Sequence, residues 1–407
     1  MEPKPARCRA SGKGRKTILT KYSHLRNFKL DGLLRIALKL LANDRGKFFT
    51  LILGITFAVF LMMMMTSVFS GIMRRSVATI LNVGAVMWVV DPSINLQSDN
   101  IPLPNYMLDA VRSIKGVKYA APLYSGVGLL KLASGRYQAA NIVGLDDATL
   151  IGRPIMLEGD IYSIYNNDAY IVVGDSEYPK LDSPSIGTTF EVNDHRGVIV
   201  GIAKALVSGL FGVPTLYTTY RRAISDLPIT RFTISSILME PKSKKDIAYI
   251  KEKVKELGYL ALTQDEFVTK NKNYYLFKTG LGTNIMIMTL ISFIVGLSIA
   301  GQTFYTFVLE NEEKFGALKA IGAKKNELII MILFQSGVVG FLGYGFGILL
   351  SSVLIGLAKL RLPEYASLVT FQNLIVSFLM VIFIIAFSSY LGIRKVTRID
   401  PFNIFRG

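Results

Sequence analysis

The chain has few of the side chains that bind metals or form disulfides. Its 407 residues include one cysteine, Cys8, and two histidines, His24 and His195. A single cysteine excludes an intramolecular disulfide, so the folded parts must be held by their apolar cores. Neither histidine has a partner at the spacing of metal ligands, and we expect a surface or structural role for both. We therefore predict no metal site.

The chain also lacks the patterns of an enzyme. A nucleotide-hydrolysing protein needs a glycine-rich phosphate loop of the form G-x-x-x-x-G-K-[ST], which this sequence does not contain. Residues 11–17 include similar residue types, but at the wrong spacing and without a preceding strand. Neither a Ser/His/Asp arrangement nor a pair of carboxylates stands out. We predict a non-catalytic chain, with no catalytic residues and no cofactor of its own.

Charged residues are nearly absent from four long apolar runs, at 48–72, 284–309, 328–358 and 373–393. Each has roughly twenty residues or more, the length of helix that crosses a ~30 Å hydrocarbon core. The first run begins too late in the chain, and is too long, to be a cleaved signal peptide. The runs predict four transmembrane helices, the first of them an uncleaved anchor.

Basic residues are concentrated beside these runs. Residues 1–48 carry thirteen Lys or Arg against three acidic residues, and the segments 310–327 and 394–407 carry four basic residues each. Because Lys and Arg resist translocation, both ends and the 310–327 loop are predicted to be cytoplasmic and 73–280 to lie outside. The outer segment is nearly balanced, with 23 basic and 20 acidic residues. We therefore expect a multi-pass protein of the bacterial cell (inner) membrane.

The formal net charge of +17 would also suit a nucleic-acid-binding protein. However, +10 of it (13 − 3) lies in residues 1–48, beside the first apolar run. Basic residues at that place attract anionic lipid headgroups by about 1 kcal/mol each. Aromatic residues are not interleaved with the basic ones, as base stacking would require. The charge therefore predicts membrane lipids as partners, and no nucleic acid.

The segment before the first span divides into two parts. Residues 1–28 are rich in Lys, Arg, Gly and Ser, which predicts a disordered basic cytoplasmic tail. In residues 29–47, polar side chains recur every four positions along one face and leucines fill the rest. This pattern predicts an amphipathic helix lying in the membrane interface. A helix packed on a partner protein is the alternative.

The outer segment 73–280 alternates strand and helix patterns. A strand at Val83–Val90, a helix at Asn105–Ile114 and a strand at Val117–Leu123 are followed, between 232 and 263, by the same order again. Two βαβ units of this kind predict one layered subdomain.

Residues 140–230, between these two units, are richer in Gly, Pro and Asp. They include strand patterns at Ala169–Val173 and at Thr189–Gly201, which predict an inserted, mostly β subdomain. The predicted fold is therefore an α-helical membrane protein with four transmembrane helices plus an α/β extracytoplasmic domain, in which a βαβ-type subdomain carries a mostly β insertion.

The third span, 328–358, would form about 46 Å of helix, which predicts that it tilts or protrudes from the membrane. It is rich in glycine. Gly343 and Gly347 are four residues apart, a spacing that lets another helix approach closely.

In the 310–327 loop, the acidic and basic residues follow a regular order that a simple connecting loop would not need. It begins with the acidic residues Glu310, Glu312 and Glu313, and its lysines follow. Acids first and bases last match the dipole of a short helix at the cytoplasmic surface. Gly322 would end such a helix before the third span begins.

This segment closely resembles the signature of MacB/FtsX-type (type VII) ABC transporter permeases, in which a charged run leads into Phe-Gly-x-Leu-Lys-Ala-Ile-Gly-Ala. The other landmarks agree in order: an elbow helix, one span, an outer domain of about two hundred residues, three more spans and a terminal Asp400-Pro401. The resemblance implies a coupling helix that docks on a separate ATPase. Its ATPase-facing residues would be Glu310, Glu313, Lys314, Phe315, Gly316, Leu318, Lys319, Ala320, Ile321, Gly322 and Ala323.

The resemblance implies a non-catalytic permease subunit without a fused ATPase domain. A pair of partner ABC ATPase subunits would bind ATP and Mg, and a second copy of the permease, identical or related, would complete the membrane part. A periplasmic adaptor protein is a further candidate partner.

The spans lack the buried charges that a hydrophilic pathway would display. This argues against a hydrophilic pathway and fits what the resemblance implies: ATP-driven closure in the cytoplasm would move the helices as levers and change the shape of the outer domain, a mechanism called mechanotransmission. The expected output is export or efflux of a hydrophobic compound, lipid or peptide from the outer face of the inner membrane. The alternatives are lipoprotein or lipid extraction, signalling to a cell-wall hydrolase, and a membrane-anchored receptor that has no ATPase.

Overall fold

The structure is a computed structural model that describes residues 32–99, 101–175, 177–208, 212–227, 234–362 and 365–397. The predictions for the tail 1–28 with Cys8 and His24, for the phosphate-loop-like residues 11–17 and for the terminal Asp400-Pro401 lie outside these residues.

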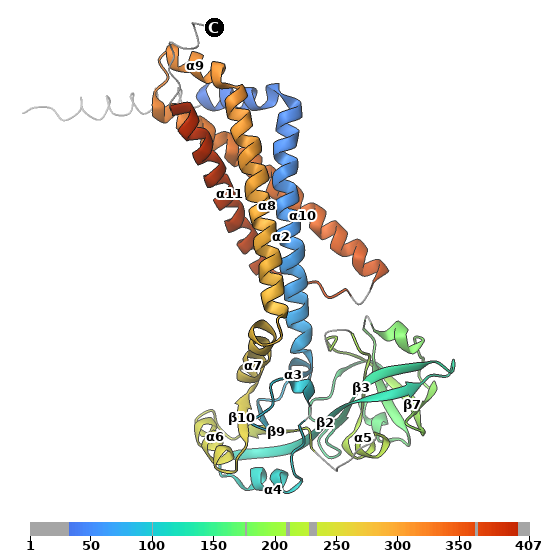
Figure 1. Cartoon of the computed structure of the whole chain (residues 1–407). Coiled ribbons are helices and arrows are strands. Elements are labelled where there is room, and N and C mark those ends of the chain that lie inside the picture. The colour runs from blue at the N-terminus through green and yellow to red at the C-terminus, as the bar shows by residue number, and fades with distance from the viewer. Residues whose placement is uncertain are drawn as a thin grey trace, which may run out of the picture. The chain divides into compact units, whose positions relative to one another are not determined.

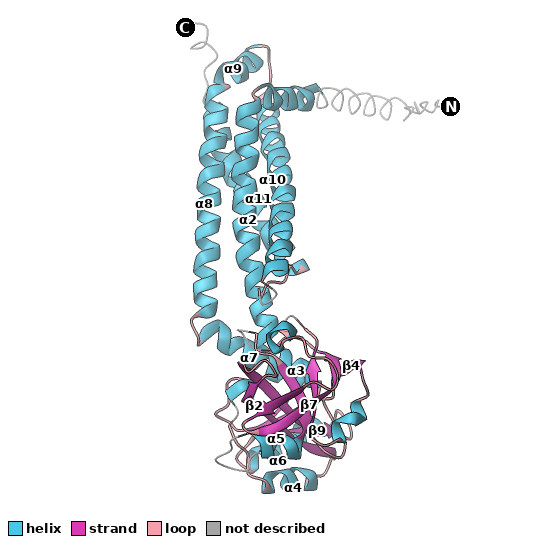
Figure 2. Ribbon diagram, turned by 90° about the vertical axis from the view of Figure 1, so that its right-hand side faces the viewer, coloured by secondary structure: helices cyan, strands magenta, loops and turns pink. Residues whose placement is uncertain are grey.

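The chain divides into two compact units. The membrane unit consists of residues up to Met65, Met288–Val353 and residues from Thr370 onward. The α/β unit consists of Thr66–Ile287 and Leu354–Val369. The helices are cyan and the strands magenta in Figure 2, and all the strands belong to the α/β unit.

Four helices in the described part of the chain are long and apolar enough to cross a membrane, as the sequence predicted. They are α2 (Arg45–Ser76), α8 (Leu281–Glu310), α10 (Lys325–Arg361) and α11 (Phe371–Thr397) (Figure 1). In hydrocarbon a helix satisfies all of its own backbone hydrogen bonds, which is why these runs are helical. Each helix extends beyond its predicted apolar run by a few residues, and α2 and α11 end with basic residues in their last turns.

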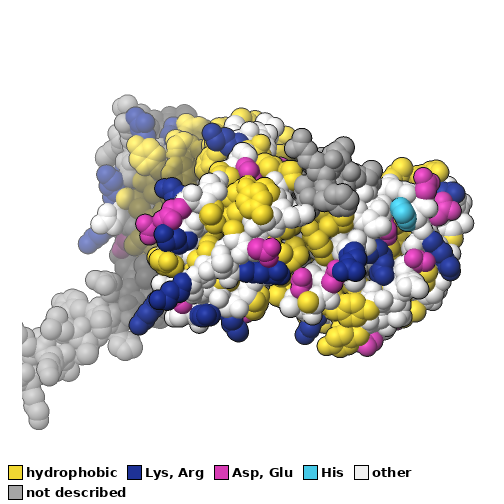
Figure 3. Space-filling view, turned by 90° about the horizontal axis from the view of Figure 1, so that it is seen from below, with side chains coloured by type: hydrophobic (Ala, Val, Ile, Leu, Met, Phe, Trp, Pro, Cys, Tyr) yellow, Lys and Arg dark blue, Asp and Glu magenta, His cyan; other side chains and the backbone are white. Residues whose placement is uncertain are grey.

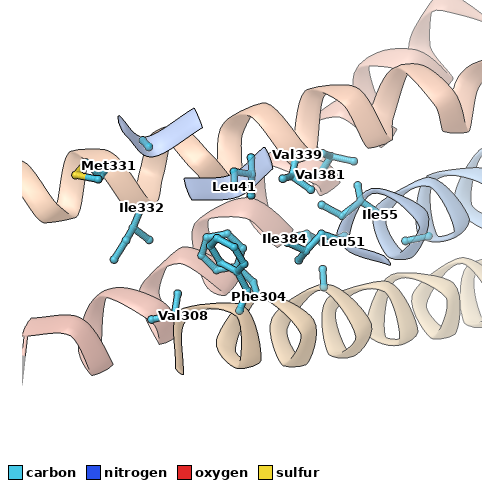
Figure 4. Packing of buried hydrophobic residues seen from close by; sticks show 14 of the residues in the cluster. Leu41, Leu51, Ile55, Phe304, Val308, Met331, Ile332, Val339, Val381 and Ile384 are labelled. Carbon is cyan, nitrogen blue, oxygen red and sulfur yellow. The ribbon is translucent and has the colours of Figure 1, made fainter. Parts of the chain in front are cut away.

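The core of the membrane unit is built from all four helices. Figure 4 labels Leu51 and Ile55 of α2 together with residues of α8, α10 and α11 that converge on the same cluster. Leu41, from a helix over residues 32–43, is also part of this cluster. These residues are 0–4 % exposed, so the helices are joined by close side-chain packing rather than by charges.

Helix α10 approaches α2 through its glycines. A Cβ added at Gly343 would lie 2.7 Å from Cβ of Ile55, and one at Gly347 would lie 2.5 Å from Cβ of Val59. Real Cβ atoms do not come this close, so only glycine permits the contact. The two predicted packing glycines therefore contact a helix of the same chain.

The helix over residues 32–43 packs partly on the chain's own spans. Ala37 and Leu41 are buried in the membrane core, whereas Ile36 and Leu38 are each 41% exposed. The Nε2 amide of Gln335, buried on α10, donates a hydrogen bond to the carbonyl of Ala37 at 2.9 Å. A buried amide bonded to a backbone carbonyl fixes this helix against α10.

The first layer of the α/β unit is one sheet with helices on both sides. Its elements are β1 (Met87–Val90), α4 (Tyr106–Ser113), β2 (Val117–Lys131), β9 (Ser236–Pro241), α6 (Asp246–Glu256) and β10 (Leu260–Thr263). The strand order is β10-β1-β9-β2, and all neighbours are antiparallel. Each of the two predicted βαβ units therefore holds one strand of the other between its own two strands.

Apolar residues fill both faces of this sheet. Met107 and Val111 of α4 and Ile250 of α6 lie against one face. On the other face, the Trp88 ring lies 5.5 Å from that of Phe267 on α7 (Gln264–Phe277). The layered subdomain that the sequence predicted from two βαβ units is confirmed by this arrangement of the sheet and its helices.

The inserted subdomain is a small barrel. Its strands are β2, β3 (Tyr137–Leu145), β4 (Ile155–Glu158), β5 (Ala169–Val173), β6 (Thr189–Val192), β7 (His195–Lys204) and β8 (Thr215–Thr219), and α5 (Tyr220–Asp226) packs beside them. Among the described residues, pairing runs from β2 through β3, β8, β5, β7 and β6 back to β2. A ring of this kind leaves these strands without free edges. The predicted mostly β insertion is confirmed.

Two predicted strand boundaries are wrong. Val83 ends the short helix α3 (Ala78–Val83), whose cap is Gly84 at φ 64°, so the strand begins only at Met87. The strand predicted at Thr189–Gly201 is a hairpin, β6 and β7. Its turn residues Asn193 and Asp194 have φ values of 45° and 69°, which Asn and Asp tolerate better than other residues.

Basic and acidic side chains alternate over the face of the α/β unit that Figure 3 presents. Ion pairs in this unit include Lys131 with Glu191 at 2.9 Å and Arg136 with Asp182 at 2.7 Å. Exposed pairs of this kind contribute little stability. They agree with the near balance of charge in this part of the sequence.

We expect Gly347→Ala and Gly343→Ala each to lower the thermal stability of the purified protein, because the added methyl groups would push α2 and α10 apart. Gly345→Ala is the matched control on the same helix, since nothing lies within 4 Å of its added Cβ. There the substitution should be neutral or should stabilise by up to ~1 kcal/mol. Equal melting temperatures for all three variants would contradict the close contact.

Candidate functional site

The predicted coupling segment is a short helix between two spans. It is α9 (Glu312–Ala320), with acidic residues in its first turn and Lys319 in its last. Asn311 alone separates it from α8. The amide nitrogen of Asn311 donates to the Phe307 carbonyl at 2.8 Å, and its oxygen accepts from Lys314 at 2.7 Å. The Asn311 side chain therefore forms hydrogen bonds with both helices at the turn between α8 and α9.

The end of α9 is equally well defined. Gly322 has φ 102°, a conformation that favours glycine. Its N–H donates to the Lys319 carbonyl at 3.1 Å, and the N–H of Ala323 donates to the Leu318 carbonyl at 3.0 Å. This is the Schellman pattern, in which a left-handed glycine ends a helix. Gly322 therefore ends the helix by the mechanism expected from the sequence.

One face of α9 is packed into the membrane unit. Phe315 is 0% exposed and lies in the core cluster with Leu41, Phe304 and Leu328, which come from the 32–43 helix, α8 and α10. Gly316 is also buried, and Leu318 and Ala323 pack against the same core. Phe315 and Gly316 thus lie on the inner side of α9, and the prediction that these two face an ATPase is wrong.

The opposite face of α9 is exposed and largely uncharged at its C-terminal end. Ile321 is 85% exposed. Glu313, Ala317 and Ala320 are exposed too, and Ala317 lies four residues from both Glu313 and Ile321, which places these three on one side of the helix. Of the predicted residues, Glu310, Lys314 and Gly322 are exposed as well, and Leu318, Lys319 and Ala323 are half-buried. The exposed surface therefore consists of the apolar side chain of Ile321 and the charged side chains of Glu313 and Lys314.

Ion pairs tie the ends of this segment to other parts of the membrane unit. Glu310 pairs with Lys47 at the start of α2, and Lys47 also lies 2.8 Å from Asp44. The hydrogen bond from Lys47 lowers the pKa of the Asp44 carboxyl. On the other side, Glu312 lies 3.4 Å from Lys395 of α11. All these groups are partly exposed and screened by water, so the pairs contribute little stability.

Three residues of the site were not predicted from the sequence. Ala317 falls at the variable position of the motif, although its distance of four residues from both Glu313 and Ile321 would have placed it on the same face. Lys47 and Lys395 are distant in sequence and carried no local signal.

The geometry of this segment offers a rigid, partly exposed surface. Among the residues that the structure describes, no three His, Cys, Asp or Glu side chains gather where they could hold a metal ion. His195 is a 53% exposed side chain on β7, 3.9 Å from Asp226. The site can bind a partner through shape, apolar contact and two charges.

Two family models match the chain. Residues 48–257, about half of it, match the MacB-like periplasmic core domain. Residues 285–401 match the FtsX-like permease C-terminal domain. The second match contains α9, and together the two account for most of the chain.

A protein of Staphylococcus haemolyticus, named as a hemin transport system permease protein, HrtB, is 24% identical over 219 residues. The match covers 54% of this chain and 58% of that protein, so this chain aligns with little more than half of the relative's length.

Two solved structures are similar to parts of the chain. The extracellular domain of the ABC-type transporter YknZ from Gram-positive bacteria is 11% identical, with a TM-score of 0.34, over 44% of this chain and 100% of that one. The periplasmic region of MacB from Actinobacillus actinomycetemcomitans is 14% identical, with a TM-score of 0.36, over 48% of this chain and 96% of that one. At TM-scores this low, neither likeness adds to the fold described above.

We expect Phe315→Ala to destabilise the protein by roughly 3 kcal/mol, because it leaves a cavity where three helices meet. Ile321→Ala should change stability by no more than about 0.5 kcal/mol, since its side chain is exposed. Thermal unfolding of the two variants in the same detergent would compare these effects. A larger loss for Ile321→Ala than for Phe315→Ala would contradict the packing of α9.

Proposed function

The chain belongs to the MacB/FtsX-type permeases of ABC transporters, and from that premise we propose that a separate ATPase docks on the exposed face of α9. In this proposal the partner pair of ATPase subunits binds ATP and Mg, and the permease contributes no catalytic residue. A second permease copy, identical or related, completes the membrane part. The assembly lies in the bacterial inner membrane with both chain ends in the cytoplasm.

The observation that carries the proposal is the exposure of Ile321. Ile321 is 85% exposed at the end of a helix fixed by Phe315 and Gly322, so a partner that covered it would remove its apolar side chain from water. Buried apolar residues at the centre of a small interface commonly supply most of its binding energy. Glu313 and Lys314, both exposed beside it, would set the orientation of the partner.

The helices that adjoin α9 could transmit a movement caused by ATPase docking to other parts of the chain. α9 is joined to α8 through Asn311 and to α10 through the Gly322 turn, so a force on α9 acts on both spans. Helices α2, α8 and α10 each have residues in both units. Because α9 is packed into the core through Phe315, it would move with the bundle rather than independently of it.

The proposed output is export or efflux of a hydrophobic compound, lipid or peptide from the outer face of the membrane. Ser, Thr, Asn and Gln are the buried polar side chains within the described spans, and the middle parts of these spans carry no Lys, Arg, Asp or Glu. This composition disfavours a path for ions or polar solutes. The S. haemolyticus relative is named for hemin, whose large ring is mostly hydrophobic although it carries two carboxylates.

Lipoprotein or lipid extraction and signalling to a cell-wall hydrolase would use the same coupling segment and remain alternative outputs. A periplasmic adaptor protein would be needed only if the cargo must cross a second membrane. The remaining alternative is a receptor of this architecture that has no ATPase. In that case no ATPase would copurify with the chain or cover Ile321.

The test of the docking proposal is charge reversal on α9. We expect the double variant Glu313→Lys/Lys319→Glu, and separately Ile321→Asp, to reduce copurification of the proposed partner ABC ATPase by about tenfold, while the permease remains folded. Each substitution opposes the partner surface by charge repulsion or by loss of apolar contact.

Lys242→Glu is the matched control, because Lys242 is an exposed lysine of the α/β unit, far from α9 in sequence. ATPase recovery and ATP hydrolysis should be unchanged in this variant. Unchanged recovery in both α9 variants, with wild-type melting temperatures, would overturn the proposal.

The proposed orientation is tested by labelling single cysteines. In a Cys8→Ser background, Tyr137→Cys should react with a membrane-impermeant maleimide added to whole cells whose outer layers have been made permeable, because Tyr137 is 62% exposed in the α/β unit. Lys324→Cys, beside α9, should react only after the cell membrane is opened. The reverse labelling pattern would contradict the proposed orientation of the chain in the membrane.

A further inference from the structure

A cavity in the α/β unit lies where two of the spanning helices end, and its lining combines apolar residues with three cations. It measures about 290 Å³ and is lined by the last turns of α2, the end of α10 and segments near Leu206 and Ser367. The apolar stretch of α2 ends shortly before Arg74, and that of α10 ends at Lys359. Hydrocarbon gives way to headgroups at such ends.

The cavity and the coupling segment are on opposite faces of the membrane. Helix α2 starts beside α9 through the Lys47–Glu310 pair, and α10 starts directly after α9. Each crosses the membrane once, so their other ends emerge on the far side. The cavity is therefore at the headgroup level of the leaflet away from α9.

Three cations line this cavity. Arg74 and Lys359 are exposed, and within the described ranges neither forms an ion pair. The third, Arg75, is only 11% exposed, and its Nη1 is 3.7 Å from Oε1 of the buried Glu177. Glu177 also pairs with Lys180 at 2.9 Å, so this one carboxylate is shared between two cations. A net positive charge remains in the cavity.

Buried donors in the cavity wall lack acceptors. The hydroxyl of Ser367, a residue that is 5% exposed, has no hydrogen-bond partner, and neither has Nη1 of Arg75, among the residues described. Buried polar atoms are nearly always paired in native structures. Two such donors beside two exposed cations form a site for an anion with several acceptor oxygens.

The wall that carries Ser367 is held in place. A Cβ at Gly71 would lie 2.5 Å from the Ala366 carbonyl and 2.6 Å from the Ser367 nitrogen, so this segment runs directly against α2. The N–H of Leu368 donates to the Ser67 carbonyl at 2.8 Å. The cavity is therefore a built feature of the fold and not a gap between mobile surface side chains.

We propose that this cavity binds the phosphate headgroup of an anionic phospholipid in the leaflet opposite the coupling segment. Arg74 and Lys359 attract the negative charge, and the Ser367 hydroxyl and Nη1 of Arg75 donate to phosphate oxygens. The acyl chains lie along the apolar surfaces of the α2 and α10 ends, which face hydrocarbon. The proposal does not depend on ATPase docking, because a permease that never meets an ATPase would still bind the lipid.

The experiment is a lipid titration of the full-length protein in a zwitterionic detergent, followed by native mass spectrometry. The probes are dioleoyl-phosphatidylglycerol, dioleoyl-phosphatidylcholine and inorganic phosphate. We expect phosphatidylglycerol to bind about tenfold more tightly than phosphatidylcholine. The double variant Arg74→Gln/Lys359→Gln should lose about tenfold in affinity for it, equivalent to ~1.4 kcal/mol.

Arg361→Gln is the matched control, since this cation lies two residues beyond Lys359, is exposed and does not line the cavity. It should bind phosphatidylglycerol as the wild type does. Ser367→Ala should weaken binding by a smaller factor, about threefold, without loss of charge. Thermal unfolding would establish that each variant is folded.

Two results would overturn the proposal. Equal weakening by Arg361→Gln and by Arg74→Gln/Lys359→Gln would mean that a diffuse surface charge, and not this cavity, attracts the lipid. Displacement of the lipid by inorganic phosphate at the same concentration as by added phosphatidylglycerol would identify a free-anion site instead. Loss of ATPase copurification, by contrast, would bear only on α9.

Discussion

The packing of Phe315 among the helices of the membrane unit fixes what the coupling segment can do. Its ring is fully buried beside residues of the 32–43 helix, α8 and α10, and this aligns the remaining faces of α9. Once Phe315 points inward, a helix of this length must turn Glu313, Ala317 and Ile321 outward. One apolar contact therefore creates both the rigid attachment and the exposed surface that the proposed ATPase would meet. The ion pairs of Glu310 and Glu312 add orientation, but they are too exposed to supply the rigidity.

A second constraint shapes the α/β unit. A subdomain can be inserted into a fold without disturbing it only where the chain leaves and returns at neighbouring positions. β2 and β9 are adjacent in the first sheet, so the chain between them can form a separate body without disturbing the layer. β2 belongs to both bodies, because Val117–Leu123 pairs with β9 and Tyr124–Lys131 pairs with β3. A shared strand joins the two subdomains more stiffly than a flexible linker would. Movement of one is therefore expected to be transmitted to the other.

The candidate site was predicted in part from the sequence. The existence of α9, its charge order and its stop at Gly322 follow from local rules, since capping and dipole effects act over one turn. Which of its residues face inward was not predicted, because the motif marks the conserved type of a residue and not its environment. Phe315 and Gly316 were assigned to the ATPase-facing surface for this reason, and they are buried. Similarly, the strand predicted over Thr189–Gly201 concealed a turn at Asn193 and Asp194, since alternating residues look the same on both arms of a hairpin.

Four membrane-spanning helices, and a βαβ layer with a mostly β insertion, were predicted from the sequence alone. Hydrophobic run length and local periodicity are sufficient for this, because they reflect transfer free energies and backbone geometry that do not depend on distant residues. Only the tertiary structure decided which glycines meet α2, which face of α9 is exposed, and that Arg74, Arg75, Lys359 and Ser367 line one cavity. These residues are nearly three hundred positions apart at their extremes. Their proximity results from the packing of whole helices and loops, which no local pattern in the chain records.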